Sequence, residues 1–384
     1  MIPYGRQSIS EEDIQSVVEV LRSDWLTQGP MVERFEEAMA QRCEVSHTLA
    51  VNNGTAALHL ACLAIDLGPG DRLWTSPNSF VASANCARYC GASVDFVDID
   101  PRTYNLCPVH LENKLIEADR IGALPKAVVA VHFAGQSCDM ARIQELAKQY
   151  GFYVIEDACH ALGGSYQDVP VGSCRYSDLT VFSFHPVKTI TTGEGGMVTT
   201  KDARLYEKLS LLRNHGITRD PAFFQGMADG ALYYEQITLG FNFRLSDLHA
   251  ALGLSQLTRL ASFVTHRSQI AARYNQALAD LPLVLPWQAP DVTSAYHLYP
   301  VQVAQDSQVT RAEVVQYLRE REIRVNTHYI PIHTQPYYRA MGFAQGDYPN
   351  AERYYQGALS LPIYFELSET QQDTVVAALH KVWH

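Results

Sequence analysis

Short apolar, β-branched runs alternate with helical patterns along the chain from about residue 46. The predicted strands occupy residues 47–51, 71–75, 93–97, 126–133 and 152–156. Parallel strands need a crossover connection, which a helix usually supplies. The repeated alternation therefore predicts an α/β fold with a mostly parallel central sheet covered by helices.

The clearest helical pattern spans residues 139–150. Asp139 is the expected N-cap and Gly151 the expected C-terminal stop. Apolar side chains recur on one face of this helix, at Met140, Ile143, Leu146, Ala147 and Tyr150. A second helix is expected over residues 80–90 and ends before a glycine, Gly91.

Two more strands are expected at residues 179–184 and 196–200, before helices that begin near Asp202 and Ser246. Residues 217–241, between these helices, are rich in glycine and aromatic residues and have the pattern of a loop. A loop of this length inside a compact domain is usually functional.

The alternation changes after about residue 260. A long helical pattern runs to Leu281, and a strand at 297–303, a helix at 310–322, extended chain at 323–331 and two closing helices are expected after it. We therefore predict a large domain over residues 14–260 and a smaller C-terminal α/β domain over 261–384. Residues 1–13 are expected to pack against the smaller domain.

Composition narrows the classes of protein that the chain can represent. Apolar residues make up 47% of it and charged residues 18%, which suits a folded chain with a substantial core. The formal net charge of −11 makes nucleic acid an unfavourable partner. The first residues show no signal pattern and no apolar run reaches 18 residues, so we expect a cytoplasmic protein with no membrane partner.

The eight cysteines are scattered and form no C-x-x-C pair, so reduced and mostly buried thiols are expected. His328 and His333 are the two candidate metal-ligating histidines. Their five-residue spacing fits no helix face, and no carboxylate or cysteine clusters beside them. We therefore expect no metal site.

Ligands of parallel α/β sheets bind beyond the carboxyl ends of the strands. Gly54-Thr55-Ala56 stands there, between the 47–51 strand and a predicted helix. Gly54 permits close backbone approach, and the helix start offers free N–H groups to a phosphate. Any tight strand-to-helix turn can contain Gly-Thr, so the motif alone also fits a purely structural turn.

Three other residues follow predicted strands. Asp157 fits a helix cap, an ion-pair partner or the anion that keeps a pyridine nitrogen protonated. Lys188 follows a buried strand among apolar neighbours; most lysines are surface residues, but a partly desolvated one has a lowered pKa and can form a Schiff base. Phe80 fits either core packing or stacking on a flat cofactor ring.

The ordered motifs NGT, SF, EDACHA, SFHPVK, GEGG, GFNFR and HYIP strongly resemble the DegT/DnrJ/EryC1/StrS family of sugar-nucleotide aminotransferases, from Tyr4 to the last helix. These are fold-type I enzymes whose cofactor is pyridoxal 5′-phosphate (PLP), which alternates with its amino form PMP. The resemblance implies that Lys188 forms the Schiff base and Asp157 pairs with the pyridine nitrogen. It also implies phosphate contacts from Gly54, Thr55, Ala56 and Ser183, a ring contact from Phe80, and His160 near the phenolic oxygen.

The same resemblance implies a homodimer with composite active sites. Asn242 would reach the cofactor phosphate in the other subunit. Several residues match sugar-nucleotide contacts of the family: Tyr4, Leu26, Thr27, Gln28, His328 and Tyr329, the last two expected from the partner subunit. Tyr337 is a further candidate for orienting the sugar.

His160 and the SFHPVK run resemble the 4-aminotransferases of the family, because the 3-aminotransferases tend to carry Gln and a Tyr-Pro-Thr-Lys type run. The expected reaction transfers the amino group of L-glutamate to C4 of a UDP-4-keto-6-deoxy-N-acetylhexosamine, as in pseudaminic acid biosynthesis. UDP-4-keto-arabinose and a 3-keto sugar are the alternative acceptors.

Three rival functions fit the sequence less well. Related PMP-dependent dehydratases have histidine where Lys188 stands. A non-catalytic PLP-binding protein would be expected to lack part of the site, and no part is missing. A nicotinamide dehydrogenase would need G-x-G-x-x-G where NNGTAA stands.

Overall fold

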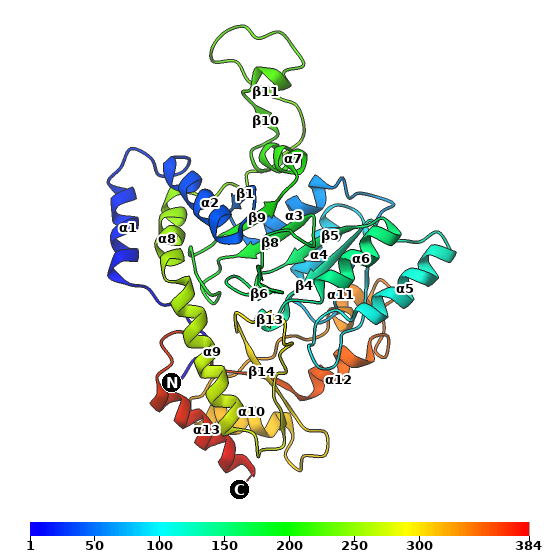
Figure 1. Cartoon of the computed structure of the whole chain (residues 1–384), viewed down its shortest axis with the longest axis vertical. Coiled ribbons are helices and arrows are strands. Elements are labelled where there is room, and N and C mark those ends of the chain that lie inside the picture. Colours follow the sequence, from blue (N-terminus) through cyan, green and yellow to red (C-terminus); the bar gives the residue numbers. More distant parts are fainter. Residues whose placement is uncertain (384) are drawn as a thin grey trace.

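The computed structural model describes residues 1–383, and a seven-stranded sheet forms its centre (Figure 1). The strand order is β1 (His47–Val51), β9 (Gly196–Thr200), β8 (Leu179–Ser183), β5 (Tyr153–Asp157), β4 (Ala127–Val131), β2 (Arg72–Thr75) and β3 (Ser93–Phe96). The neighbours β3–β2, β2–β4, β4–β5 and β5–β8 are parallel, whereas β9 runs antiparallel to β8 and β1. The predicted α/β class with a mostly parallel sheet is confirmed.

Helices cover both faces of this sheet, because its strands are apolar on both sides. In β4, Val129 and Val131 pack into one core, and Val128 and Ala130 pack into another. The first core includes α3 (Gly54–Ala64), α4 (Ala82–Tyr89) and α7 (Ala203–Arg213). The second includes α5 (Pro108–Arg120) and α6 (Met140–Tyr150).

The predicted helix boundaries hold where a capping residue marks them. Asp139 accepts a hydrogen bond from the Arg142 N–H at 3.2 Å, and Gly151 ends α6 with a φ of 75°. Asp202 caps α7 in the same way, and Ser246 caps α8 (Asp247–Thr258).

Several elements were not anticipated. Helices α1 (Glu11–Leu21) and α2 (Pro30–Cys43) lie beside α8 in Figure 1, and the 217–241 segment forms a hairpin of β10 (Ile217–Thr218) and β11 (Glu235–Gln236) that projects from the molecule. A capping box of Ser10 and Asp13 begins α1. The stretch at 217–241, expected to be a loop, is therefore mostly loop, and two short paired strands close it.

The C-terminal elements share a separate apolar core with Ile2. Around it lie α9 (Leu260–Ala277), α10 (Arg311–Glu320), α13 (Glu369–Trp383) and a sheet of β12 (Leu283–Val284), β14 (Tyr299–Val303) and β15 (Ala358–Leu361). The remaining elements are α11 (Pro336–Arg339), α12 (Pro349–Gly357) and a small sheet of β13 (Val292–Thr293), β6 (Ser165–Tyr166) and β7 (Val169–Pro170). This core supports the division at residues 14–260 and 261–384, which stays a prediction.

Within residues 1–383, no helix is both long enough and apolar enough to span a bilayer.

Candidate active site

A cavity of about 760 Å³ lies beyond the carboxyl ends of β5 and β8. Its walls include ten residues that the sequence had indicated: Tyr4, Gly54, Thr55, Phe80, Asp157, His160, Ser183, Lys188, His328 and Tyr329. They come from both ends of the chain and from four strand ends between them, so the fold gathers the motifs that the sequence left far apart.

Lys188 lies in a turn that follows β8, where its N–H donates to the His185 carbonyl at 2.8 Å. Burial lowers the pKa of the Lys188 amine, and the electrostatic influence of the neighbouring Cys159 and Asp157 side chains opposes this shift. A lysine with a lowered pKa is more often neutral, which is the form that attacks a carbonyl carbon. The cavity therefore holds a lysine suited to covalent attachment of an aldehyde.

Asp157 is a buried carboxylate, 6% exposed, at the end of β5. It accepts hydrogen bonds from the Ser83 hydroxyl at 2.6 Å and from the Cys159 N–H at 3.2 Å. None of the ion pairs found in residues 1–383 includes it. A buried charge is expensive unless it is paired, so this carboxylate, which forms no ion pair within the chain, is available to a cationic group of a ligand.

The neighbouring carboxylate, Glu156, is fully satisfied. It points to the opposite face of the strand, where His132 Nε2 donates to it at 2.6 Å and Ser177 and Thr180 donate at 2.5 and 3.1 Å. The Cys138 N–H donates to His132 Nδ1, so the ring proton lies on Nε2. The contrast with Asp157 shows that only one of the two adjacent acids is left for a ligand.

The start of α3 forms a tight anion cradle. The Asn53 side chain accepts from the Ala56 N–H at 2.8 Å, while the N–H groups of the first helical residues have no partner within the helix. A Cβ atom on Gly54 would stand 2.9 Å from the Ser183 Cβ, so only glycine fits. The amides of Gly54 and Thr55 and the Ser183 hydroxyl therefore meet at the helix's positive end.

His160 is a neutral histidine in the cavity wall. Its Nδ1 accepts from the Ala134 N–H at 3.3 Å, so the proton lies on Nε2, which faces the Tyr329 hydroxyl at 3.1 Å. Burial and the nearby Lys188 charge lower the pKa of His160 well below its usual value, and the same causes lower the pKa of His328 to about 4. Both rings are uncharged at neutral pH.

Comparison with known proteins agrees with this geometry. Residues 7–380 match the DegT/DnrJ/EryC1/StrS aminotransferase family. The chain is 41% identical over 385 residues to the spore coat polysaccharide biosynthesis protein SpsC of Bacillus subtilis, covering 99% of this chain and 97% of SpsC. The chain belongs to this family.

Two solved aminotransferase structures superpose on this chain over almost their whole length. Helicobacter pylori PseC, an aminotransferase involved in the biosynthesis of pseudoaminic acid, has a TM-score of 0.90 at 32% identity and covers 100% of this chain and 99% of PseC. The PMP form of the sugar aminotransferase Spr1654 from Streptococcus pneumoniae has a TM-score of 0.89 at 29% identity, with the same coverage. The chain is a PLP-dependent sugar aminotransferase of fold type I.

The residues of the cavity fit the cofactor of this family. Lys188 would hold it covalently, Asp157 would supply the anion at its ring nitrogen, and the Gly54 cradle would take its phosphate. The bound cofactor withdraws electrons from the carbon that gains and loses a proton. Ala56 is less suited to the phosphate role, because it lies outside the cavity wall and its N–H is bonded to Asn53.

The expectation that His328 and Tyr329 come from the partner subunit is wrong. Both line the same cavity as Lys188 of their own chain. Tyr329 is anchored there by its N–H to the Asn78 side chain at 3.2 Å and by its hydroxyl to His160. The sequence offered no indication of this, because the contacts join residues about 170–250 positions apart.

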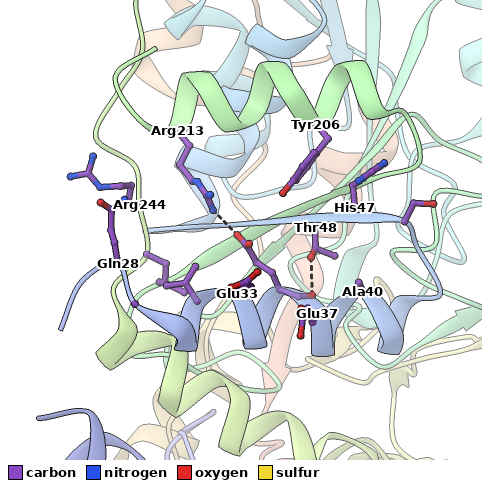
Figure 2. A pocket seen from close by; sticks show the side chains of 14 residues that line it. Gln28, Glu33, Glu37, Ala40, His47, Thr48, Tyr206, Arg213 and Arg244 are labelled. Carbon is purple, nitrogen blue, oxygen red and sulfur yellow. Dashed lines mark hydrogen bonds and ion pairs between the residues drawn. The ribbon is translucent and has the colours of Figure 1, made fainter. Parts of the chain in front are cut away.

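Five other predicted residues lie outside the Lys188 cavity. Leu26, Thr27 and Gln28 are in the loop between α1 and α2, and Gln28 lines a second cavity of about 420 Å³ together with Arg244 (Figure 2). Asn242 bridges to Asn214 beside that cavity. Tyr337 is exposed on α11 and packs against Tyr338.

Some cavity residues were missed by reasoning from the sequence. Asn53 and Ser79 adjoin recognised motifs, and Ser83, which lies outside the cavity wall, holds Asp157 from α4. His297 is buried, lies 4.4 Å from His160 between ring centroids, and its Nδ1 has no hydrogen-bond partner in residues 1–383. It stands just before β14, where no local pattern separates a site histidine from a core histidine.

Proposed function

We propose that this aminotransferase moves the amino group of L-glutamate to C4 of a UDP-4-keto-6-deoxy-N-acetylhexosamine, a reaction of the pseudaminic acid type. The observation that carries the proposal is His160 beside Lys188 in one cavity, together with the SFHPVK run that precedes the lysine. The likeness to PseC points in the same direction. We also propose that the enzyme works in the cytoplasm as a homodimer.

The size and lining of the cavity suit a sugar acceptor. At about 760 Å³ it lies well within the range of small-molecule sites, with room beside a cofactor. Tyr4, Phe80 and Tyr329 supply ring faces and hydroxyl groups to its wall. Such rings contact the apolar faces of a pyranose while hydroxyls and imidazoles bond its polar edge.

Different residues of the chain transfer protons, hold the proton of the ring nitrogen and orient the substrate. Lys188, released from the cofactor by the incoming amine, is the base that removes a proton from one carbon and returns it to another. Asp157 holds the proton of the ring nitrogen, with Ser83 keeping the carboxylate in place. Neutral His160 and Tyr329 form a hydrogen-bonded pair in the wall and would orient the substrate without adding charge.

The scarcity of cationic side chains in the cavity wall supports the proposed dimer. Among the described residues that line it, Lys188 is the sole lysine and none is arginine. A diphosphate needs cations, and arginine is the usual choice because of its forked donors. Gln28, Asn242 and Arg244 gather instead on the far side of β1, where we propose that they complete the site of the partner subunit.

An amination assay with purified keto sugars tests the regiochemistry. The enzyme, L-glutamate and PLP are combined with the UDP-linked 4-keto-6-deoxy-N-acetylhexosamine, its 3-keto isomer or UDP-4-keto-arabinose, and product configuration is read by NMR. We expect kcat/KM to be highest for the first acceptor, because a displacement of about 1 Å at the reacting carbon can cost ~10²-fold. Preference for the 3-keto isomer would overturn the C4 assignment and leave the aminotransferase function intact.

A further inference from the structure

A cleft of about 730 Å³ lies in the C-terminal part of the molecule, among β14, α10 and α12 (Figure 1). We name it the α12 cleft. Its volume is close to that of the Lys188 cavity, yet the two walls have no residue in common. Clefts of this size suit small molecules, and neither the cofactor nor the acceptor of the proposed reaction accounts for this one.

The wall of the α12 cleft is cationic. Arg311 and Arg353 are the only charged side chains among the described residues that line it. Glu313, an acid in the first turn of α10, lies outside the wall, where its carboxylate accepts from the N–H and the hydroxyl of Thr310 at 2.8 Å each. The chain as a whole has a net charge of −11, so a cleft with two arginines and no acid in its wall is a local site for anions.

Both guanidinium groups are available to a ligand. The Arg353 side chain is exposed on α12 and makes no hydrogen bond or ion pair within residues 1–383. Arg311 begins α10; its guanidinium lies 4.7 Å from the centre of the Tyr355 ring and donates to the Tyr355 carbonyl from Nη1. This hydrogen bond uses one of the five N–H donors of Arg311. The cleft therefore presents one anchored arginine and one unpaired arginine.

The rest of the polar lining indicates the class of ligand. A phosphate monoester carries a charge of about −1.5 to −2 at pH 7, which two arginines match better than the single charge of a carboxylate does. Gln305 and Gln356 also line the cleft, and their side chains have no hydrogen-bond partner within residues 1–383. An amide both donates and accepts, so these two side chains suit the hydroxyl groups of a sugar.

We propose that the α12 cleft binds a sugar phosphate, with Arg311 and Arg353 on the phosphate and Gln305 and Gln356 on the hydroxyl groups, and that this ligand regulates the aminotransferase. The ligand binds without any chemical step, at a place separate from the cofactor and the acceptor. The proposal therefore does not depend on which keto sugar the enzyme aminates.

Tyr354 connects the α12 cleft to the Lys188 cavity. It is 3% exposed, lines the cleft, and donates from its hydroxyl to the His328 carbonyl at 2.9 Å. Its ring centroid lies 4.4 Å from that of Tyr104, whose hydroxyl accepts from Gln302 of the cleft wall at 2.7 Å. One side chain thus joins the wall of the cleft to a residue in the wall of the cofactor cavity.

This connection gives the regulation a direction. A ligand that binds the cleft in the arrangement described here favours that arrangement over others. The same arrangement holds His328 in the wall of the Lys188 cavity. We therefore expect occupation of the cleft to strengthen binding in the Lys188 cavity.

The first test measures binding by calorimetry to borohydride-reduced holoenzyme, whose covalently held cofactor excludes the probes from the Gly54 cradle. Glucose 1-phosphate should bind once per chain and more tightly than inorganic phosphate. Arg353→Gln should weaken this binding at least ~10-fold, because hydrogen bonds to charged groups are the strong ones. Arg319→Gln makes the same change at an exposed position of α10 outside the cleft and should bind like wild type.

Three results of this titration would overturn the proposal. They are no detectable binding of glucose 1-phosphate, binding that Arg353→Gln and Arg311→Gln leave unchanged, and an equal loss in the Arg319→Gln control. Equal affinity for the two probes would make free phosphate the ligand and contradict the contacts of the sugar hydroxyls with Gln305 and Gln356.

The second test follows the half-reaction with L-glutamate by stopped-flow absorbance, because this step needs no sugar acceptor. Saturating glucose 1-phosphate should lower the apparent dissociation constant of glutamate at least about fivefold, the lower end of usual coupling between sites. Tyr354→Phe keeps the ring but loses the hydroxyl bond to His328, so it should bind glucose 1-phosphate and lose most of this effect. Binding that leaves the glutamate constant unchanged or raises it in wild type, or an effect that survives in Tyr354→Phe, would contradict the regulation through Tyr354.

Discussion

The two cavities of this protein differ in how their charges are satisfied. In the second cavity Glu36 pairs with Arg213 at 2.5 Å and accepts the Ala50 N–H at 2.7 Å, and Arg244 bonds with Asn214 at 2.6 Å. In the Lys188 cavity, Asp157 has no ion-pair partner, the Gly54 and Thr55 amides have no acceptor within α3, and His297 has an unpaired nitrogen within residues 1–383. Unpaired polar groups in a cavity indicate a ligand site, because burying such groups without a partner costs free energy of folding.

The largest expected effect comes from removing the amine of the Lys188 cavity. Lys188→Ala should lower amination by more than the ~10²–10⁴-fold of a lost general acid–base group, because covalent attachment is lost as well. Lys208→Ala is the control, since Lys208 is an exposed lysine paired with Asp66. Borohydride reduction followed by peptide mapping should place the cofactor on Lys188, and its recovery on another lysine would contradict the assignment.

Asp157→Asn should keep the fold and lower transamination by about 10²–10³-fold, the effect of losing one preorganised electrostatic partner. An amide keeps the shape and the Ser83 bond but supplies no charge. Stopped-flow absorbance of the half-reaction with glutamate measures the loss. A half-reaction at the wild-type rate would give Asp157 a structural role, like that of Glu156.

Breaking the ion pair of the second cavity should affect stability rather than chemistry. Arg213→Met leaves the Glu36 carboxylate largely buried, 14% exposed, without its cation, and should lower the free energy of unfolding by about 3 kcal/mol. The double variant Glu36→Gln/Arg213→Met should recover most of this loss in urea denaturation. Unchanged stability of Arg213→Met would contradict this structural role of the Glu36–Arg213 ion pair.

Mixing inactive variants tests how the two regions work together. Lys188→Ala combined with Asn242→Ala should recover roughly a quarter of wild-type activity, because half of the dimers are mixed and each has one intact site. Lys188→Ala combined with His328→Ala should recover none, since both residues belong to one chain's cavity. Recovery in the second mixture, with subunit exchange verified, would return His328 to the partner subunit.

The smallest effect concerns the satisfied acid beside Asp157. Burial would raise the pKa of Glu156, but hydrogen bonds from His132, Ser177 and Thr180 prevail and lower it. Its stabilisation is therefore present above the unfolded-state pKa of about 4.3 and is lost as pH falls through the folded-state value. The stability gap between wild type and Glu156→Gln should shrink below pH 4 in denaturant titrations, and a gap that is constant with pH would contradict this.

The sequence predicted those features that local patterns determine. The strands at 47–51 and 196–200, and helix α6 with its caps, lie where periodicity and capping residues placed them. The strand β15 and the β10–β11 hairpin were missed, because β15 is hidden in a region read as helical and the two hairpin strands are too short to show alternation.

The same distinction, between features set by local patterns and features set by long-range contacts, applies to the candidate site. Residues inside motifs, such as Lys188 and Asp157, could be assigned from their position after a strand. The Ser83–Asp157 bond, the place of His297 and the origin of His328 depend on contacts between distant segments. Such contacts are decided by how the helices and the C-terminal segment pack, which no local pattern encodes.

Backbone hydrogen bonds join the N-terminal residues of the chain to segments of the C-terminal region. Ile2 exchanges backbone hydrogen bonds with the 322–324 segment, and the Tyr4 carbonyl accepts from the Ile363 N–H at 3.1 Å. At ribosomal rates of about 5–20 residues per second, Tyr4 waits roughly 20–70 s for residue 363 to be made. During synthesis the cavity thus remains open on its Tyr4 side until almost the whole chain has emerged, so a nascent enzyme cannot enclose its substrate before translation is nearly complete.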